Sequence, residues 1–240
     1  MNNIDARALA VAGLCALALS GCTSSNSKSN SVDQQTASPG SSVATDTVNV
    51  APAKKIRIVE SGFGQNPKDL QYAWVTALVH NDAAAVGDFV VVNFNMKDPK
   101  GNLIASGSQT DQFSRDGEDL AVGTQVEVTS KAKVASVEAT AVLSNNASKE
   151  AFPELPTGAV KVIEKYGYYK AQFEVTNPLG DPVKSPHIGV ICKDGAGKVN
   201  GGGISFPDLI PPKGKVLADT SVMVSDKPSS CKAYAGGPVF

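Results

Sequence analysis

The residue types that most often carry catalysis or bind metals are sparse in this chain, and their spacing favours neither. Only two histidines occur, His80 and His187, and they lie far apart in the sequence. A zinc site needs three or four ligands, usually at close spacing, and no such cluster surrounds either histidine. The Gly-x-Ser-x-Gly motif of serine hydrolases is also missing. We therefore expect both histidines at the surface, no catalytic residues, no metal site and no cofactor.

Two other stretches have a composition that could bind a ligand. Four carboxylates gather at Asp111, Asp116, Glu118 and Asp119, without the spacing of an EF-hand loop. We expect a solvated acidic face there, and the alternative is a weak calcium site. A glycine triplet, Gly201 to Gly203, predicts a bulge or a crowded backbone. A ligand that approaches the backbone is the alternative for that triplet.

The N-terminus has the pattern of an export signal. An apolar run from Ala8 to Leu19 is shorter than the roughly 20 apolar residues that a membrane-spanning helix needs. Its length is typical of the apolar core of a signal peptide. The run ends in Leu19-Ser20-Gly21-Cys22, which resembles the lipobox of bacterial lipoproteins. We therefore expect residues 1–21 to be a lipoprotein signal peptide.

The resemblance implies a lipid on Cys22. In bacterial lipoproteins the signal is cleaved just before that cysteine, and diacylglycerol is linked to its sulfur as a thioether. Two acyl chains give a stable anchor, whereas one chain gives marginal binding. We expect the mature chain on the extracytoplasmic face of the cell membrane. The alternative is an ordinary cleavage site with an incidental cysteine.

A polar segment follows the lipobox. Residues 22–53 are rich in Ser, Thr, Asn and Ala, and no aromatic residue occurs before Phe63. Such a composition buries too little apolar surface to offset chain entropy. We expect a disordered tether that would typically span roughly 30 Å. A glycosylated Ser/Thr-rich stalk is the alternative.

Beyond the tether, the apolar residues alternate with polar ones. Val90, Val92, Phe94 and Met96 share one parity, and turn residues Asp98-Pro-Lys-Gly101 follow them. Alternation with period two is typical of half-buried strands, and the turn predicts a hairpin. No segment has a convincing helical period. The sequence therefore predicts an all-β protein built from antiparallel β-sandwiches.

The strand pattern occurs twice. With an offset of 96 residues (177 − 81), Asn177 aligns with Asn81 without a gap through strands and turns. We expect two tandem copies of one fold. Residues 54–143 form the first β-sandwich module, residues 144–157 form a linker, and residues 158–240 form the second module.

Each of the four cysteines has a predicted fate. Cys15 leaves with the signal and Cys22 carries lipid, so only Cys192 and Cys231 remain to pair. The offset of 96 aligns Cys192 with Met96 and Cys231 with Ala135. Met96 and Ala135 each lie on the same face as the apolar residues of their strand. We expect an inter-sheet or cross-strand disulfide in the second core, since disulfides persist outside the cytoplasm.

The second copy also carries a family pattern. Its residues are Tyr168, Ala171, Phe173, Val175 and Asn177, then Ile188, Val190 and Cys192, then Asp194 and Gly197, and finally Ile210, Pro211 and Gly214. This pattern resembles the FxLYD-type immunoglobulin-like modules of bacterial surface proteins and lipoproteins. In the first copy, Arg115-Asp-Gly-Glu118 replaces the Pro-x-x-Gly step. The resemblance implies a non-enzymatic extracytoplasmic module.

The composition limits the classes of partner that this chain could bind. The formal net charge of -1 argues against a nucleic-acid partner, which favours a basic surface. We expect a non-catalytic, lipid-anchored protein that presents its modules to an envelope protein or a cell-wall component. The alternative is a lipoprotein that binds a small ligand between the modules, near Trp74, Tyr168 and Tyr169. Because Trp74 is the only tryptophan, any carbohydrate-stacking surface must be small.

Overall fold

A computed structural model describes residues 56–84, 86–144 and 150–238 of the chain. The described ranges contain strands and no helix, which confirms the all-β prediction. No segment in the described ranges is therefore a helix able to cross a membrane. The contacts gather Val50–Phe240 into one compact unit. The N-terminal half (residues 56–144) and the C-terminal half (residues 150–238) both belong to it.

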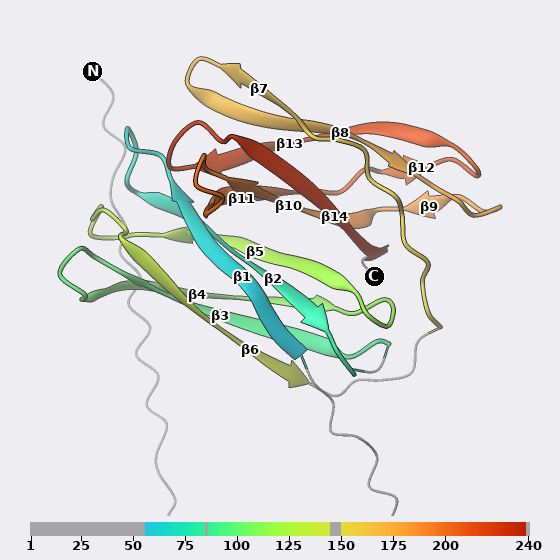
Figure 1. The fold of residues 1–240 in the computed structure, drawn as a ribbon, viewed down its shortest axis with the longest axis horizontal. Helices are drawn as coiled ribbons and strands as arrows, with labels where there is room; N and C mark the ends of the chain where they lie inside the picture. The colour runs from blue at the N-terminus through green and yellow to red at the C-terminus, as the bar shows by residue number, and fades with distance from the viewer. Residues whose placement is uncertain (1–55, 85, 145–149, 239–240) are drawn as a thin grey trace, which may run out of the picture. The chain divides into compact units, whose positions relative to one another are not determined.

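The N-terminal half is a β-sandwich of two three-stranded sheets (Figure 1). Its strands are β1 (Ile56–Gln65), β2 (Tyr72–Asn81), β3 (Phe89–Lys97), β4 (Leu103–Gln112), β5 (Asp119–Glu127) and β6 (Ser136–Ser144). The sheets have the orders β1-β2-β5 and β4-β3-β6. Alternating side chains such as Val75 on β2 and Val92 on β3 meet in one buried cluster between the sheets.

The C-terminal half encloses a second core. Its strands are β7 (Lys161–Lys165), β8 (Tyr168–Thr176), β9 (Val183–Lys184), β10 (Pro186–Lys193), β11 (Val199–Ser205), β12 (Leu209–Ile210), β13 (Lys215–Val224) and β14 (Ser230–Pro238). The order is β14-β10-β11-β13-β8-β7, with a separate β12-β9 pair. β11 pairs with β13 only at Gly201 and Gly202. The two ends of the long sheet therefore face each other, and Phe173 and Val190 meet between them.

The strand pairing of one half is repeated in the other. The order β1-β2-β5 corresponds to β7-β8-β13, and β4-β3-β6 corresponds to β11-β10-β14. Ala73 lies opposite Val126, and Tyr169 lies opposite Val222 at the same offset of 96 residues (169 − 73). The repeat in the sequence thus corresponds to a repeat of topology and register.

The hairpin predicted after Met96 forms in both halves. Oδ1 of Asp98 accepts hydrogen bonds from the backbone N–H groups two and four residues later, at 2.8 and 2.9 Å. Oδ1 of Asp194 accepts the same two bonds at 2.9 Å. Gly101 and Gly197 have φ values of 85° and 77°, in the left-handed region that glycine adopts without strain. Each turn is followed by a bulge at the start of the next strand, where Ile104 on β4 and Asn200 on β11 are skipped in the pairing.

Asn81 and Asn177 close equivalent strand ends, as their position in the repeat suggests. Both side chains are buried. The amide of Asn81 donates to the carbonyl of Arg115 at 3.0 Å, and that of Asn177 donates to the carbonyl of Pro211 at 3.1 Å. The Arg115 segment is therefore the structural counterpart of the Pro-x-x-Gly step.

The last strand departs from the ungapped alignment. Val137 on β6 lies opposite Met96, whereas Cys231 on β14 lies opposite Cys192. Cys231 thus corresponds to Val137, and its predicted alignment with Ala135 is wrong by two residues (137 − 135). The cause is a shorter connection before β14. A shift of two residues keeps a side chain on the same face of a strand, so Cys231 still packs against the C-terminal core.

Part of the expected linker belongs to the C-terminal core. Leu155 is almost fully buried there, and Phe152 packs against the same cluster. Thr157 forms an isolated bridge with Val175 on β8, and its hydroxyl donates to the carbonyl of Ala233. Residues 152–157 therefore line the sandwich rather than only connecting the halves.

Candidate functional site

The outer faces of two sheets pack against each other and join the halves. Leu78 on β2 and Ala121 on β5 meet Ile191 on β10 and Val199 on β11 in a third buried apolar cluster. In Figure 1 these sheets, β1-β2-β5 and β14-β10-β11, are the two inner layers. The molecule is therefore a stack of four layers, and each inner sheet is covered on both faces.

Glycines allow the inner sheets to come close. A Cβ atom at Gly64 on β1 would lie 2.2 Å from the carbonyl oxygen of Met223, and one at Gly62 would lie 2.6 Å from Cβ of Val199. Side chains therefore have no room at these positions. The backbone of β1 packs directly on residues of the C-terminal half.

The triplet Gly201 to Gly203 is crowded, as predicted. Gly201 has a φ of 141° and follows the bulge of β11 at Asn200. A Cβ atom at Gly203 would lie 2.4 Å from the carbonyl oxygen of Ser221. The neighbouring strand β13 approaches the backbone here, and the triplet is explained without the ligand that was the alternative.

His187 is buried in this interface, so the prediction of a surface histidine is wrong for it. Its Nδ1 atom lies 3.0 Å from Oδ1 of Asp111 in the other half, and its ring stacks on Phe206. A carboxylate can only accept, so Nδ1 donates this bond. Nε2 of His187 and Oδ2 of Asp111 are buried and have no hydrogen-bond partner among the described residues. His80 stays partly exposed and lies 2.7 Å from Asp119.

Charged groups make two further links between the halves. Nζ of Lys193 lies 2.6 Å from Oε2 of Glu60, and the guanidinium of Arg115 donates to the carbonyl of Ala235 at 3.2 Å. Tyr234 packs against the apolar cluster that joins the halves. Burial, followed by Glu60 and Asp119, raises the pKa of its hydroxyl to about 12. The interface is thus partly polar.

The acidic stretch is solvated only in part: Asp116 and Asp119 are exposed, as its composition predicts, whereas Asp111 and Glu118 are not. Glu118 is only 1% exposed. Its carboxylate accepts bonds from the backbone N–H and hydroxyl of Ser114 and pairs with Arg115 at 3.2 Å. Burial raises the pKa of Glu118, against the lowering effects of Arg115 and the Ser114 bonds. With Asp111 bound to His187, the carboxylates face different partners, and no metal-binding cluster of His, Cys, Asp or Glu occurs in the described residues.

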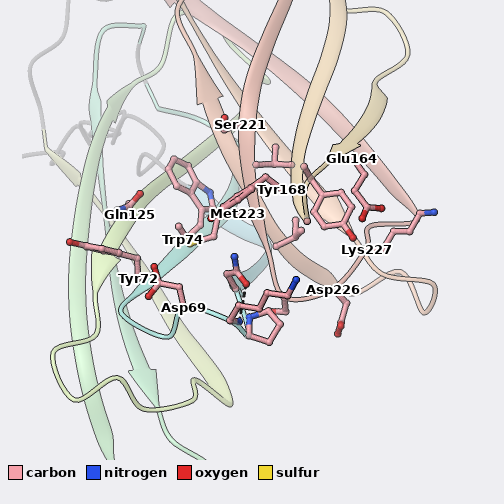
Figure 2. A pocket seen from close by; sticks show the side chains of 18 of the residues that line it. Asp69, Tyr72, Trp74, Gln125, Glu164, Tyr168, Ser221, Met223, Asp226 and Lys227 are labelled. Carbon is pink, nitrogen blue, oxygen red and sulfur yellow. Dashed lines mark hydrogen bonds between the residues drawn. The ribbon is translucent and has the colours of Figure 1, made fainter.

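A cleft opens at one edge of this interface. It has a volume of about 520 Å³ and is lined by residues of both halves. Figure 2 shows Tyr72, Trp74 and Gln125 on one side and Tyr168 on the other, with Met223 between them. The three residues named for the small-ligand alternative, Trp74, Tyr168 and Tyr169, all line it. The sequence did not predict the participation of Tyr72 and Gln125.

Trp74 is held in place by packing. Its Nε1 atom is buried and has no hydrogen-bond partner in the described part of the chain. A Cβ atom at Gly123 would lie 3.0 Å from Nε1, and one at Gly202 would lie 3.1 Å from it. Since β5 and β11 both contact the indole, the packing of the halves fixes the orientation of the ring in the cleft.

The side chains at the mouth of the cleft carry charges of both signs. Lys68 and Lys227 are basic, and Asp69, Glu164 and Asp226 are acidic. The opposed charges leave no strong field of one sign.

Tyr169 keeps its proton in these surroundings. Desolvation, followed by Glu164 and Asp226, raises the pKa of its hydroxyl above the ordinary value of 10.0. A tyrosine hydroxyl is a hydrogen-bond donor at neutral pH with or without this shift.

The predicted disulfide is present. Cys192 and Cys231 are joined across β10 and β14, with a sequence separation of 39 and a Cα–Cα distance of 4.0 Å. It is the cross-strand form of the two that were expected. Cys192 is fully buried in the C-terminal core. The bond lies away from the cleft, since neither cysteine lines it.

Several predicted features fall outside the described residues. These are the signal peptide, the lipidated Cys22 and the tether of residues 22–53. The expectation of a lipid anchor therefore remains a prediction.

One signal for the interface is visible in the sequence. At the offset of 96 residues (189 − 93), the exposed Asn93 and Asn95 of β3 correspond to Gly189 and Ile191 of β10. β10 is buried on both faces over most of its length. When the outward positions of a strand are polar in one copy of a repeat and apolar or glycine in the other, the outer face of the second strand is covered.

Comparison with protein-family models gives no match for this chain, and comparison with curated proteins gives no significant match.

Proposed function

We propose that this chain is a lipid-anchored, non-catalytic envelope protein that binds an envelope protein or a cell-wall component in the cleft between its halves. One observation carries the proposal: four aromatic side chains, Tyr72, Trp74, Tyr168 and Tyr169, line one cleft and come from both halves. Aromatic residues with a polar handle are enriched where proteins bind partners. The cleft thus has the composition of a recognition site.

The anchor and the architecture are part of the same proposal. The lipobox at Cys22 supports attachment to the extracytoplasmic face of the membrane, and the disulfide Cys192–Cys231 agrees with a location outside the cytoplasm. The resemblance to FxLYD-type modules supports a binding role and an immunoglobulin-like reading of both halves. The tether of residues 22–53 would hold the cleft away from the membrane surface.

Crosslinking in cells tests the binding role. We expect the wild-type chain to capture an envelope partner, Tyr168→Ala to lose most of the captured material, and Tyr166→Ala to retain it. Tyr166 is a matched control, because it lies two residues from Tyr168 and is 88% exposed but does not line the cleft. Equal capture by all three chains, or no partner at all, would contradict the proposal.

Cell fractionation tests the anchor. We expect the wild-type chain in the membrane fraction and Cys22→Ser in the soluble extracytoplasmic fraction, because the serine lacks the sulfur that accepts the lipid. Intact mass should show two acyl chains on the wild-type protein. A membrane-bound Cys22→Ser chain would contradict a lipid anchor at this residue.

A second candidate is a small-ligand-binding lipoprotein. The cleft volume of about 520 Å³ lies within the roughly 300–1,000 Å³ of small-molecule sites. A thermal-shift screen with metabolites tests it, and the expected result is stabilisation that disappears in Tyr168→Ala. Absence of any stabilising metabolite would count against this candidate and leave the proposal of a large partner.

A further inference from the structure

From the chemistry of its walls, we infer that the cleft binds a short, uncharged oligosaccharide segment of a wall or surface polysaccharide. This inference rests on the proposed function and names its ligand class. The ring of a sugar has an apolar C–H face and a hydroxyl edge. A site for it needs flat apolar side chains next to neutral hydrogen-bonding groups.

The aromatic side chains supply the flat surfaces. Trp74 and Tyr72 come from β2, and Tyr168 and Tyr169 come from β8 in the other half. In Figure 2, Trp74 and Tyr168 lie on opposite sides of the cleft. The strands at Gly123 and Gly202 come so close to the indole of Trp74 that a Cβ atom at either glycine would lie about 3 Å from its Nε1 atom. A fixed ring loses little conformational entropy on binding.

Neutral polar groups lie beside these rings. Gln125, Thr220 and Ser221 line the cleft. The amide of Gln125 and the hydroxyl of Ser221 can both donate and accept, whereas the hydroxyl of Thr220 donates to the carbonyl of Ile204 and can only accept from a ligand. The hydroxyl of Tyr169, which also lines the cleft, is a further donor. Hydroxyl groups of a sugar, which also donate and accept, fit this set without a charge on the ligand.

The charges disfavour a polyanion as the ligand, and the pairing of β13 disfavours a peptide that adds along this strand. Two lysines and three carboxylates at the mouth do not form the basic surface that a polyanion requires. A peptide that adds to a sheet needs an unpaired strand edge. On β13 in the cleft, Val222 pairs with Tyr169 of β8, while Met223 and Val224 pair with Gly202 and Gly201 of β11.

The single tryptophan makes the test direct. Trp74 is the only tryptophan of the chain, so its fluorescence reports on the cleft alone. The full mature chain, kept in a detergent without sugar headgroups, is titrated with the β-1,4-linked tetramers of N-acetylglucosamine and of glucose. Calorimetry is run in parallel. We expect saturable binding of at least one tetramer in both measurements.

Two variants locate the binding. Tyr168→Ala should weaken it about tenfold, the size of one lost aromatic contact, and Tyr166→Ala should change it by less than about twofold. Absence of binding of both tetramers at several millimolar would overturn the inference, and so would equal effects of the two variants. If crosslinking in cells still depends on Tyr168 in that case, the proposed function stands and only the ligand class is wrong.

Discussion

Nδ1 of His187 and Oδ1 of Asp111 lie 3.0 Å apart across the layer that joins the halves. Both side chains are largely buried, at 5% and 13% exposure. His80 and Asp119 form a similar pair at 2.7 Å inside the N-terminal half, with 25% and 45% exposure. The two pairs share their chemistry and differ in burial.

This difference predicts unequal stability effects. Asp111→Ala leaves a buried imidazole N–H without an acceptor and should lower the free energy of unfolding by about 1–3 kcal/mol. Asp119→Ala should lower it by at most about 1 kcal/mol, as is typical of exposed pairs. Urea unfolding of both variants measures the contrast. Equal losses would show that the buried pair does not hold the halves together.

The disulfide can be removed without changing its packing much, because the N-terminal half shows which residues fill the same space. Met96 and Val137 stand where Cys192 and Cys231 stand in the repeat. The double variant Cys192→Met, Cys231→Val should lose about 4 kcal/mol, the chain-entropy value for a loop of this length. Chemical denaturation under non-reducing conditions measures this loss.

Two results would contradict that account. A double variant within about 1 kcal/mol of the wild type would mean that the bond adds little beyond packing. Alkylation of both cysteines in the non-reduced mature protein would mean that the bond is not formed in the cell. The expected mass shows no free thiol.

Close packing of the halves predicts that Gly64 does not tolerate a methyl group. Gly64→Ala should lower the free energy of unfolding by about 1–3 kcal/mol, because the new Cβ would lie 2.2 Å from a backbone oxygen. Gly195→Ala is the control, since a Cβ there would have no neighbour within 4 Å, and its effect should stay within about 0.5 kcal/mol. Thermal and urea unfolding measure both. A neutral Gly64→Ala would contradict the close approach.

Glu118 predicts a specific pH dependence of stability. Burial raises its pKa above the ordinary 4.5, so the folded protein binds more protons than the unfolded chain once the pH exceeds about 4.5. This group therefore makes the free energy of unfolding fall as pH rises from there through its folded pKa. Glu118→Gln cannot titrate and should lack this fall. A wild-type advantage over Glu118→Gln that grows with pH would contradict the burial effect.

Much of the fold follows from period-two patterns and turn residues. Val92, Phe94 and Met96 point into the core as their parity predicts. The ladder of β13 with β8 keeps the predicted offset because both strands are long and continuous. The predicted register of Cys231 was wrong because a pattern that alternates with period two looks the same after a shift of two residues.

The burial of His187, Asp111 and Glu118 could not be read from composition. Polar residues are mostly exposed, and these three are covered only because two sheets pack face to face or a turn wraps around its own carboxylate. The cleft was predicted in part. Trp74, Tyr168 and Tyr169 are aromatic residues in or beside expected strands, but Gln125 gives no signal in the sequence that would place it next to them.

The central claim is that the cleft between the halves is the binding site. Site-specific photo-crosslinking in living cells tests it most directly, with the reactive amino acid placed at Gln125 in the cleft or at Leu103 on β4. Leu103 is 60% exposed and does not line the cleft. We expect capture of an envelope protein or wall glycan from Gln125 and not from Leu103. Equal capture from the two positions, or capture from Leu103 alone, would contradict it.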